Sequence, residues 1–133
     1  MSSFIDTNIF IYAASEHPEF GETSRGILKR VEDGESAFIS NLVLCEVAWV
    51  LEAKGLQGSI KETLEKILSY RSLSVVPVLT DDLLVGAAYM SQFGLDFNDA
   101  VNLAVMERCG CSRVYTNDRR HLGRVEHITA VFG

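Results

Sequence analysis

The stretch FIDTNIFIY, residues 4–12, guides the interpretation of the whole chain. A short apolar strand ends at the carboxylate of Asp6, and two small polar residues separate it from an apolar run with helical spacing. A strand that passes directly into a helix holds the residue at the junction in a fixed place. We therefore expect Asp6 to be the central member of an acidic site that distant carboxylates complete.

Length and composition indicate one domain that spans residues 1–133. A chain of this size can bury a core without disulfide or metal staples, and no apolar run approaches the roughly 20 residues of a membrane span. The N-terminus lacks the order of a signal peptide because Asp6 interrupts its apolar run. Three cysteines, Cys45, Cys109 and Cys111, favour reduced thiols over a disulfide framework. These features predict a cytoplasmic protein with no membrane partner.

The net charge of -6 argues against simple electrostatic adhesion to nucleic acid. It does not exclude a nuclease, because acids that hold divalent cations lower the net charge at the site that contacts phosphate. The last quarter of the chain is rich in arginine, with Arg108, Arg113, Arg119, Arg120 and Arg124. Bulk charge therefore leaves the question of nucleic-acid binding open.

Short apolar segments alternate with helical patterns along the whole chain. Strands are predicted at 3–5, 37–39, 74–79, 113–115 and 128–132. Helices are predicted at 8–14, 22–33, 41–54, 60–70, 80–94 and 98–108, with a helical turn at 118–122. This alternation is typical of an α/β fold with a central parallel sheet of four to five short strands, covered on both faces by helices.

Local signals add four expectations about these elements. The segment 41–54 is apolar on nearly every side, which predicts a largely buried helix with Trp49 in the core or in a dimer contact. Ser59 and Glu62 have the spacing of a capping box, and Pro77 favours an edge strand.

Four acids are directed to one edge of the predicted sheet. Asp6 and Asp118 follow strand ends, and Asp99 lies in the first turn of a helix that should start at the same edge, with Asp96 close by. Glu46 lies in the helix after the second strand, and helical side chains lean toward the N-terminus. Ligands of open α/β sheets bind beyond the carboxyl ends of the strands, so we expect these carboxylates to share a site.

Each acid also has a simpler explanation. Asp6, Asp96 and Asp118 are possible N-caps, and Asp99 suits the positive end of a helix dipole. A buried Glu46 needs a partner, and an arginine in a structural salt bridge would serve. Together, however, four carboxylates would repel one another unless cations neutralise them. A hard divalent cation, Mg²⁺ or Mn²⁺, is the economical answer.

Such a site suits phosphodiester hydrolysis, because a divalent cation orients phosphate and activates water. Thr116 and Asn117 could donate hydrogen bonds near the attacking water, as could Thr7, Asn8 and Ser40, although turn and cap chemistry explains them equally well. We expect no histidine in the cluster to act as general base. His121 belongs to a turn whose arginines form a solvated basic face or contact RNA phosphate.

Four segments resemble the acidic motifs of PIN domains, and the likeness is closest to VapC-type toxins of toxin–antitoxin pairs. The motifs are FIDTNI at 4–9, SNLVLCEV at 40–47, GLDFNDAV at 94–101 and VYTND at 114–118. They occur in the family's order and cover essentially the whole chain. The resemblance implies a three-layer α/β/α fold, Mg²⁺-dependent ribonuclease activity, a homodimer and, in the toxin branch, an antitoxin that blocks the active site.

Carried over by position, the resemblance assigns the acidic quartet to Asp6, Glu46, Asp99 and Asp118 and a hydroxyl beside the fourth acid to Thr116. Asp6 and Asp99 are expected to contact the metal directly, and Glu46 and Asp118 through water or a second cation. Asp96 is expected to cap a helix. The resemblance does not say which RNA is cut, although tRNA and rRNA are candidates.

Other classes of protein explain the sequence less well. A phospho-acceptor receiver domain needs an acid pair after the first strand and a lysine at a later strand end, and a dehalogenase-like phosphatase needs an acid where Asn8 stands. The pair Cys109 and Cys111 lacks partner ligands for zinc. A non-toxin PIN nuclease in RNA processing and a non-catalytic PIN-type interaction module remain open, although the module predicts loss of acids.

Overall fold

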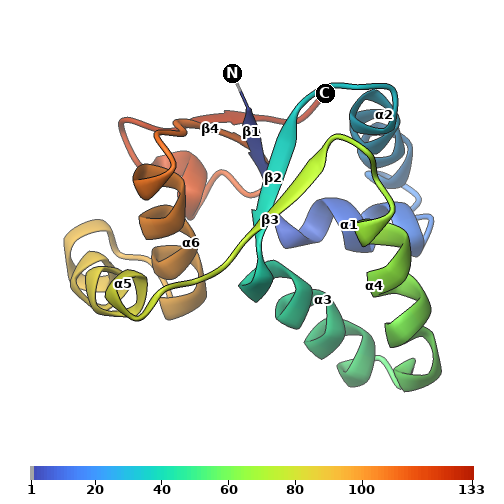
Figure 1. The fold of residues 1–133 in the computed structure, drawn as a ribbon, viewed down its shortest axis with the longest axis horizontal. Helices are drawn as coiled ribbons and strands as arrows, with labels where there is room; N and C mark the ends of the chain where they lie inside the picture. The colour runs from blue at the N-terminus through green and yellow to red at the C-terminus, as the bar shows by residue number, and fades with distance from the viewer. Residues whose placement is uncertain (1) are drawn as a thin grey trace.

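The computed structural model describes residues 2–133, and these form a five-stranded parallel sheet flanked by helices (Figure 1). The strand order is β3-β2-β1-β4-β5, with every neighbouring pair parallel. No helix in residues 2–133 is both long and apolar enough to cross a membrane. The strands are β1 (Ser3–Ile5), β2 (Ala37–Ser40), β3 (Leu73–Val76), β4 (Arg113–Tyr115) and β5 (Thr129–Val131).

Six α-helices connect the strands of the described residues and form the outer layers. Figure 1 shows α1, α2 and α4 on one side of the sheet and α5 and α6 on the other. The predicted α/β/α architecture is therefore confirmed. The helices are α1 (Thr7–Ala14), α2 (Gly21–Glu32), α3 (Asn41–Ala53), α4 (Ile60–Leu68), α5 (Thr80–Phe93) and α6 (Phe97–Arg108), with short 3₁₀ turns at Gln57–Ser59 and Leu122–Arg124.

The central strand β1 is buried on both faces, as a parallel sheet covered by helices requires. Phe4 of β1 pairs with Phe38 of β2 on one side and with Val114 of β4 on the other. Chain direction therefore brings the carboxyl ends of β1, β2 and β4 to the same edge of the sheet.

The strand predicted at 74–79 lies at the sheet edge, as Pro77 suggested, but ends earlier than expected. β3 stops at Val76, and the backbone N–H of Val78 donates to Asn41 Oδ1 at 3.0 Å instead of to a neighbouring strand. The side chain of Asn41 thus replaces a sheet partner and leads the chain away toward α5.

The expectation that helix α3 is largely buried is wrong. Only Val43, Val47 and Leu51 are buried, and their spacing of four residues places them in a single stripe. Trp49 is 52% exposed, so it does not belong to the core. The helix carries apolar side chains on nearly every side, but neighbouring elements cover only one of these sides.

Two local details also differ from expectation. The capping box at Ser59 does not form, because Ser59 ends a 3₁₀ turn in helical conformation and its carbonyl accepts from the Thr63 hydroxyl at 2.8 Å. The helical turn predicted at 118–122 lies instead at Leu122–Arg124. The Asp118 carboxylate accepts from the Arg120 N–H at 2.9 Å, which holds the preceding residues in a non-helical turn.

Helices α5 and α6 approach each other closely at Gly86. A Cβ atom at this position would lie 2.7 Å from Val101 Cγ2 and 3.0 Å from the Val101 backbone. A backbone atom cannot yield as a flexible side chain can. Gly86 therefore sets the distance between α5 and α6, the helix that carries Asp99.

We predict that Gly86→Ala destabilises the fold although alanine is the better helix former. Overpacking of a tight contact costs about 1–3 kcal/mol, which outweighs the gain of about 1 kcal/mol in helix propensity. Gly26→Ala in α2 is the matched control, because a Cβ there meets no atom within 4 Å. Urea unfolding should show Gly86→Ala below and Gly26→Ala at or above the wild-type stability. The reverse order would contradict the close approach.

Candidate functional site

The switch point of the sheet lies at the carboxyl end of β1, because the chain leaves this strand toward β2 and later returns to its other side as β4. Such points are where open α/β sheets bind ligands. The end of β1 is tied to the end of β4 by the Asp6 N–H, which donates to the Tyr115 carbonyl at 3.0 Å. The residues after both strands are thus held at one edge.

Asp6 is the N-cap of α1, but capping uses only one of its oxygens. Its Oδ1 accepts from the Thr7 N–H at 2.8 Å, whereas Oδ2 accepts from the Thr116 hydroxyl at 2.7 Å. Burial raises the pKa of Asp6, with a contribution from Asp118, although the hydrogen bonds from Thr116 and Thr7 act to lower it. Asp6 is therefore a buried carboxyl group shared between the ends of two strands.

Glu46 faces the same edge from α3 and is held by an amide. Its Oε1 accepts from Asn102 Nδ2 at 3.0 Å, and Asn102 Oδ1 accepts from the Ser40 hydroxyl at 2.6 Å. Burial raises the pKa of Glu46 to about 7, with Asp6 and Asp96 adding to the effect and the Asn102 hydrogen bond opposing it. The arginine partner that would have given Glu46 a purely structural role is absent among residues 2–133, where no salt bridge of Glu46 occurs.

Asn102 is a site residue that the sequence motifs did not lead us to expect. It is 1% exposed and lies on α6 one turn after Asp99. A buried amide needs hydrogen-bond partners, and Asn102 finds them in Glu46 and Ser40. The signal available in the sequence was one polar residue inside the apolar run Ala100–Met106.

Asp99 approaches the edge from the first turn of α6. The expected capping role of Asp96 is confirmed by the structure, since its Oδ1 accepts from the Asp99 N–H at 2.9 Å. Burial, followed by the nearby Asp6 and Asp96 carboxylates, raises the pKa of Asp99 to about 7. The side chain of Asp99 is only 16% exposed.

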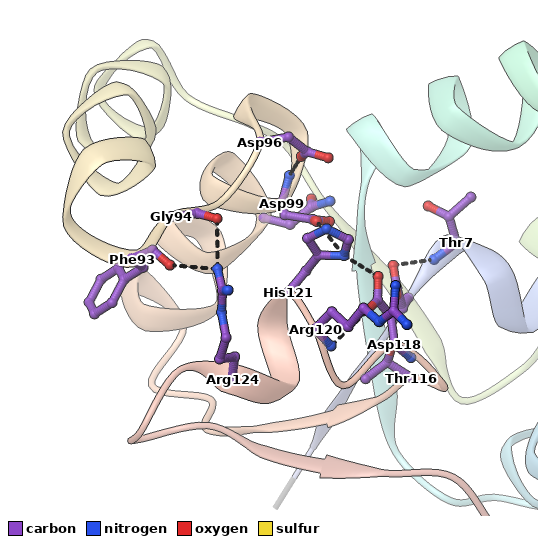
Figure 2. Close-up of polar contacts among 12 residues, drawn as sticks. Thr7, Phe93, Gly94, Asp96, Asp99, Thr116, Asp118, Arg120, His121 and Arg124 are labelled. Atoms are coloured by element: carbon purple, nitrogen blue, oxygen red, sulfur yellow. Dashed lines mark hydrogen bonds and ion pairs between the residues drawn. The ribbon is translucent and has the colours of Figure 1, made fainter.

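Asp118 follows β4 and contacts a histidine, contrary to the expectation that the cluster holds none. Figure 2 shows His121 between Asp99 and Asp118. Its Nδ1 contacts Asp118 Oδ2 and lies 3.9 Å from Asp99 Oδ2. Burial acts to raise the pKa of Asp118, but hydrogen bonds from His121 and the Arg120 N–H hold it below its usual value. The hydrogen bond to Asp118 in turn raises the pKa of His121.

Arg124 links the two segments that carry these acids. Its Nη2 donates to the carbonyl of Gly94 at 2.8 Å and to that of Phe93 at 3.2 Å, at the end of α5 (Figure 2). The segment after Asp118 is thereby attached to the loop before Asp96 and Asp99. This contact helps to set the distance between the two sides of the site.

The donor set suits a hard divalent cation such as Mg²⁺. It offers carboxylate oxygens from four segments, and the Thr7 hydroxyl beside Asp6 is buried without a hydrogen-bond partner in the described residues. In residues 2–133, no three acidic, histidine or cysteine side chains already surround one point closely enough to hold an ion. The site thus provides oxygen ligands and unfavourable charge, and an ion here would keep several waters.

These features define a doubly wound α/β domain with an acidic edge at its switch point. The protein-family model described as "PIN domain" matches residues 3–128, so the chain belongs to the PIN domain family. The resemblance noted from the four motifs is confirmed at this level. A comparison with curated protein sequences found no significant match.

Solved structures of toxin–antitoxin proteins share the fold. VapC20 of Mycobacterium tuberculosis, described as a sarcin-ricin loop cleaving toxin, is similar with a TM-score of 0.81 and 20% identity, over 99% of this chain and 100% of that one. VapBC2 from Rickettsia felis, bound to a promoter DNA fragment, is similar with a TM-score of 0.73 and 19% identity, over 98% of both chains. A toxin–antitoxin complex from Klebsiella pneumoniae is similar with a TM-score of 0.68 and 16% identity, over 96% of both chains.

We predict that the metal-free protein loses stability as the pH rises from about 4 toward 8. Glu46 and Asp99 have folded pKa values of about 7 against ordinary values of 4.5 and 3.8, so the native state keeps protons that the unfolded chain releases. The raised pKa of His121 acts in the same direction. Between pH 6 and pH 8 in EDTA, the melting temperature should fall by about 5 °C.

We also predict that Mg²⁺ raises the melting temperature more at pH 8 than at pH 6, because the cation offsets charge that protons neutralise at lower pH. Asp99→Asn should flatten the pH dependence in EDTA. Asp81→Asn, at an exposed acid in the first turn of α5, is the control and should leave it unchanged. Equal effects of the two variants would contradict a strained acidic cluster.

Proposed function

We propose that the protein is a metal-dependent ribonuclease that hydrolyses RNA phosphodiester bonds. The observation that supports this most is the convergence of Asp6, Glu46 and Asp99 on one edge, with the pKa of each raised by burial and by neighbouring carboxylates. A structural role would pair such acids with cations of the protein. Here hydroxyl and backbone N–H groups hold Asp6 and an amide holds Glu46, while Asp99 has the His121 ring at 3.9 Å. No lysine or arginine pairs with these three acids in residues 2–133, so their charge is left for a ligand to neutralise.

In this proposal the quartet Asp6, Glu46, Asp99 and Asp118 binds Mg²⁺, with Mn²⁺ as an alternative. The cation would offset charge on the phosphate and promote attack by water. Thr116 orients Asp6 through its hydroxyl, and Asn102 holds Glu46 so that its second oxygen is free. Asp6 and Asp99 are the first choices for direct contact with the cation.

We further propose that this ribonuclease is the toxin of a toxin–antitoxin pair, with a cognate antitoxin as its protein partner. The support is the similarity of fold to toxins and toxin–antitoxin complexes. A housekeeping nuclease that processes RNA is the alternative with the same chemistry. Growth arrest on expression, relieved by Asp99→Asn, would favour the toxin; unimpaired growth with an active enzyme would favour the processing role.

Cleavage of total RNA by the purified protein tests the nuclease proposal. The wild type should cut RNA in Mg²⁺ or Mn²⁺ and lose activity in EDTA. Asp6→Asn, Glu46→Gln and Asp99→Asn should each reduce the rate about 100-fold or more, because each removes a charge from the proposed metal site. Asp81→Asn should cleave like the wild type.

Two results would contradict this mechanism. Cleavage that persists in EDTA would exclude a role for the metal in catalysis. Cleavage that persists in both Asp6→Asn and Asp99→Asn would exclude a role for these acids. A folded wild type that cuts no RNA with either metal would favour the non-catalytic interaction module. Thermal melting of each variant checks that a loss of activity is not a loss of fold.

We also propose that the protein forms a homodimer through the face that includes α5. Of the large apolar side chains that are exposed in residues 2–133, six of ten lie between positions 79 and 97. Such a concentration of exposed apolar surface is typical of an interaction site. Leu84 is the most exposed of them, at 68%.

Light scattering during size-exclusion chromatography tests the dimer. The wild type should elute with twice the mass of the 14.7 kDa chain, and Leu84→Lys should shift it to the monomer, because a charge at the interface core is costly. Leu68→Lys on α4, at a residue 56% exposed, is the control and should remain dimeric. A monomeric wild type would exclude the proposal.

A further inference from the structure

A second feature lies beside the acidic edge and is not used by the proposed hydrolysis. A cavity of about 400 Å³ opens between the first turns of α1 and the loop that follows β4. It shares Asp118 with the acidic site, so a group bound in the cavity would be next to the proposed site of cleavage. Its lining consists of Asn8, Tyr12, Asn117, Asp118, Arg119 and Arg120.

The side chains that line this cavity have unused hydrogen-bonding groups. Within residues 2–133, the side chains of Asn8, Asn117, Arg119 and Arg120 make no hydrogen bond or salt bridge, and neither does the Tyr12 hydroxyl. Several polar side chains of the acidic site are by contrast engaged with one another, as Thr116 is with Asp6 and Asn102 is with Glu46. Donors and acceptors on one wall of a cavity, free of protein partners, are available to a ligand.

Tyr12 is the one aromatic side chain in this wall, and its ring is held in place. It packs against His17 and Phe20 at centroid distances of 5.0 and 5.2 Å, and those two rings stack at 5.0 Å. His17 is itself fixed, because its Nδ1 accepts from the N–H groups of Glu19 and Phe20. A ring supported in this way loses little freedom when a ligand packs on it.

The chemistry of the lining selects the kind of ligand. Carboxamides carry a donor and an acceptor side by side and can pair with the edge of a nucleobase. An aromatic ring offers a stacking surface for an unpaired base, and arginines attract the phosphates that flank it. The cavity combines all three groups within one nucleotide's reach of Asp118.

We propose that this cavity binds one unpaired nucleotide of single-stranded RNA next to the scissile phosphate and determines which base is accepted there. Asn117 and Asn8 contact the edge of the base, Tyr12 packs on it, and Arg119 and Arg120 contact flanking phosphates. The inference rests on the proposed ribonuclease function for its biological meaning. The binding event itself requires neither metal nor hydrolysis.

Fluorescence anisotropy with four short single-stranded RNAs, identical except for A, C, G or U at one central position, tests the inference. Binding is measured in EDTA at fixed salt, so that no cleavage occurs and affinities are comparable. The wild type should prefer one base. Asn117→Ala should remove the preference, and Tyr12→Ala should weaken binding of all four RNAs about tenfold, whereas Tyr12→Phe should retain stacking.

Arginine variants separate phosphate contact from base recognition. Arg119→Ala should weaken the binding of all four RNAs equally. It should also lower by about one the slope of log affinity against log salt concentration. Arg71 is exposed and precedes β3, so it lies at the amino ends of the strands, away from the acidic site. Arg71→Ala should change neither the affinity nor the salt dependence. In the cleavage assay, Asn117→Ala should raise KM more than it lowers kcat, with less base preference beside the cut.

The outcomes separate this inference from the nuclease proposal. Equal affinities of the wild type and of Asn117→Ala and Tyr12→Ala for all four RNAs, or no binding by the folded wild type, would overturn the nucleotide pocket even if RNA is cleaved. Base-selective binding that the variants abolish would support it even if no cleavage is found. Circular dichroism melting confirms that each variant is folded.

Discussion

The Asp6 carboxylate, with one hydrogen bond to the start of α1 and another to Thr116 after β4, is the interaction on which the rest of the site depends. Burying a carboxyl group is costly unless its oxygens are satisfied. The two bonds satisfy them only when the ends of β1 and β4 are in register, as the Asp6 N–H to Tyr115 carbonyl bond also requires. The fold therefore holds the central acid in place as it forms its sheet.

Repulsion among the carboxylates is the cost of this arrangement, and the surrounding residues limit it without removing it. Asn102 donates to Glu46, and His121 contacts Asp118. Neither brings a permanent positive charge to Glu46 or Asp99, whose pKa values stay near 7. Strain retained at one place in an otherwise well-packed domain is typical of functional sites.

The sequence predicted most of the fold because strands buried on both faces are short apolar runs, and because residues after parallel strands meet at one edge. These two rules placed Asp6 and Asp118 without side-chain detail. They failed for Asn102 and His121, because helical or turn spacing gives neighbours but not the groups that face them across the site. The burial of α3 was predicted wrongly because apolar residues on every side do not reveal which side is covered.

Negative and positive charge are separated into two neighbouring regions, the acidic edge and the arginine-bearing loop after Asp118. With a net charge of -6, the chain cannot attract RNA by its overall field. Any attraction of RNA must be local, and Arg119 and Arg120 lie directly after Asp118 in the loop that lines the cavity beside the acidic edge. Under the proposed function, the same loop would bring an acid to the site of cleavage and two cations to the approach of the RNA. The proposed metal site needs such cations beside it, not within it, because an arginine inside the cluster would neutralise the charge that a metal ion requires.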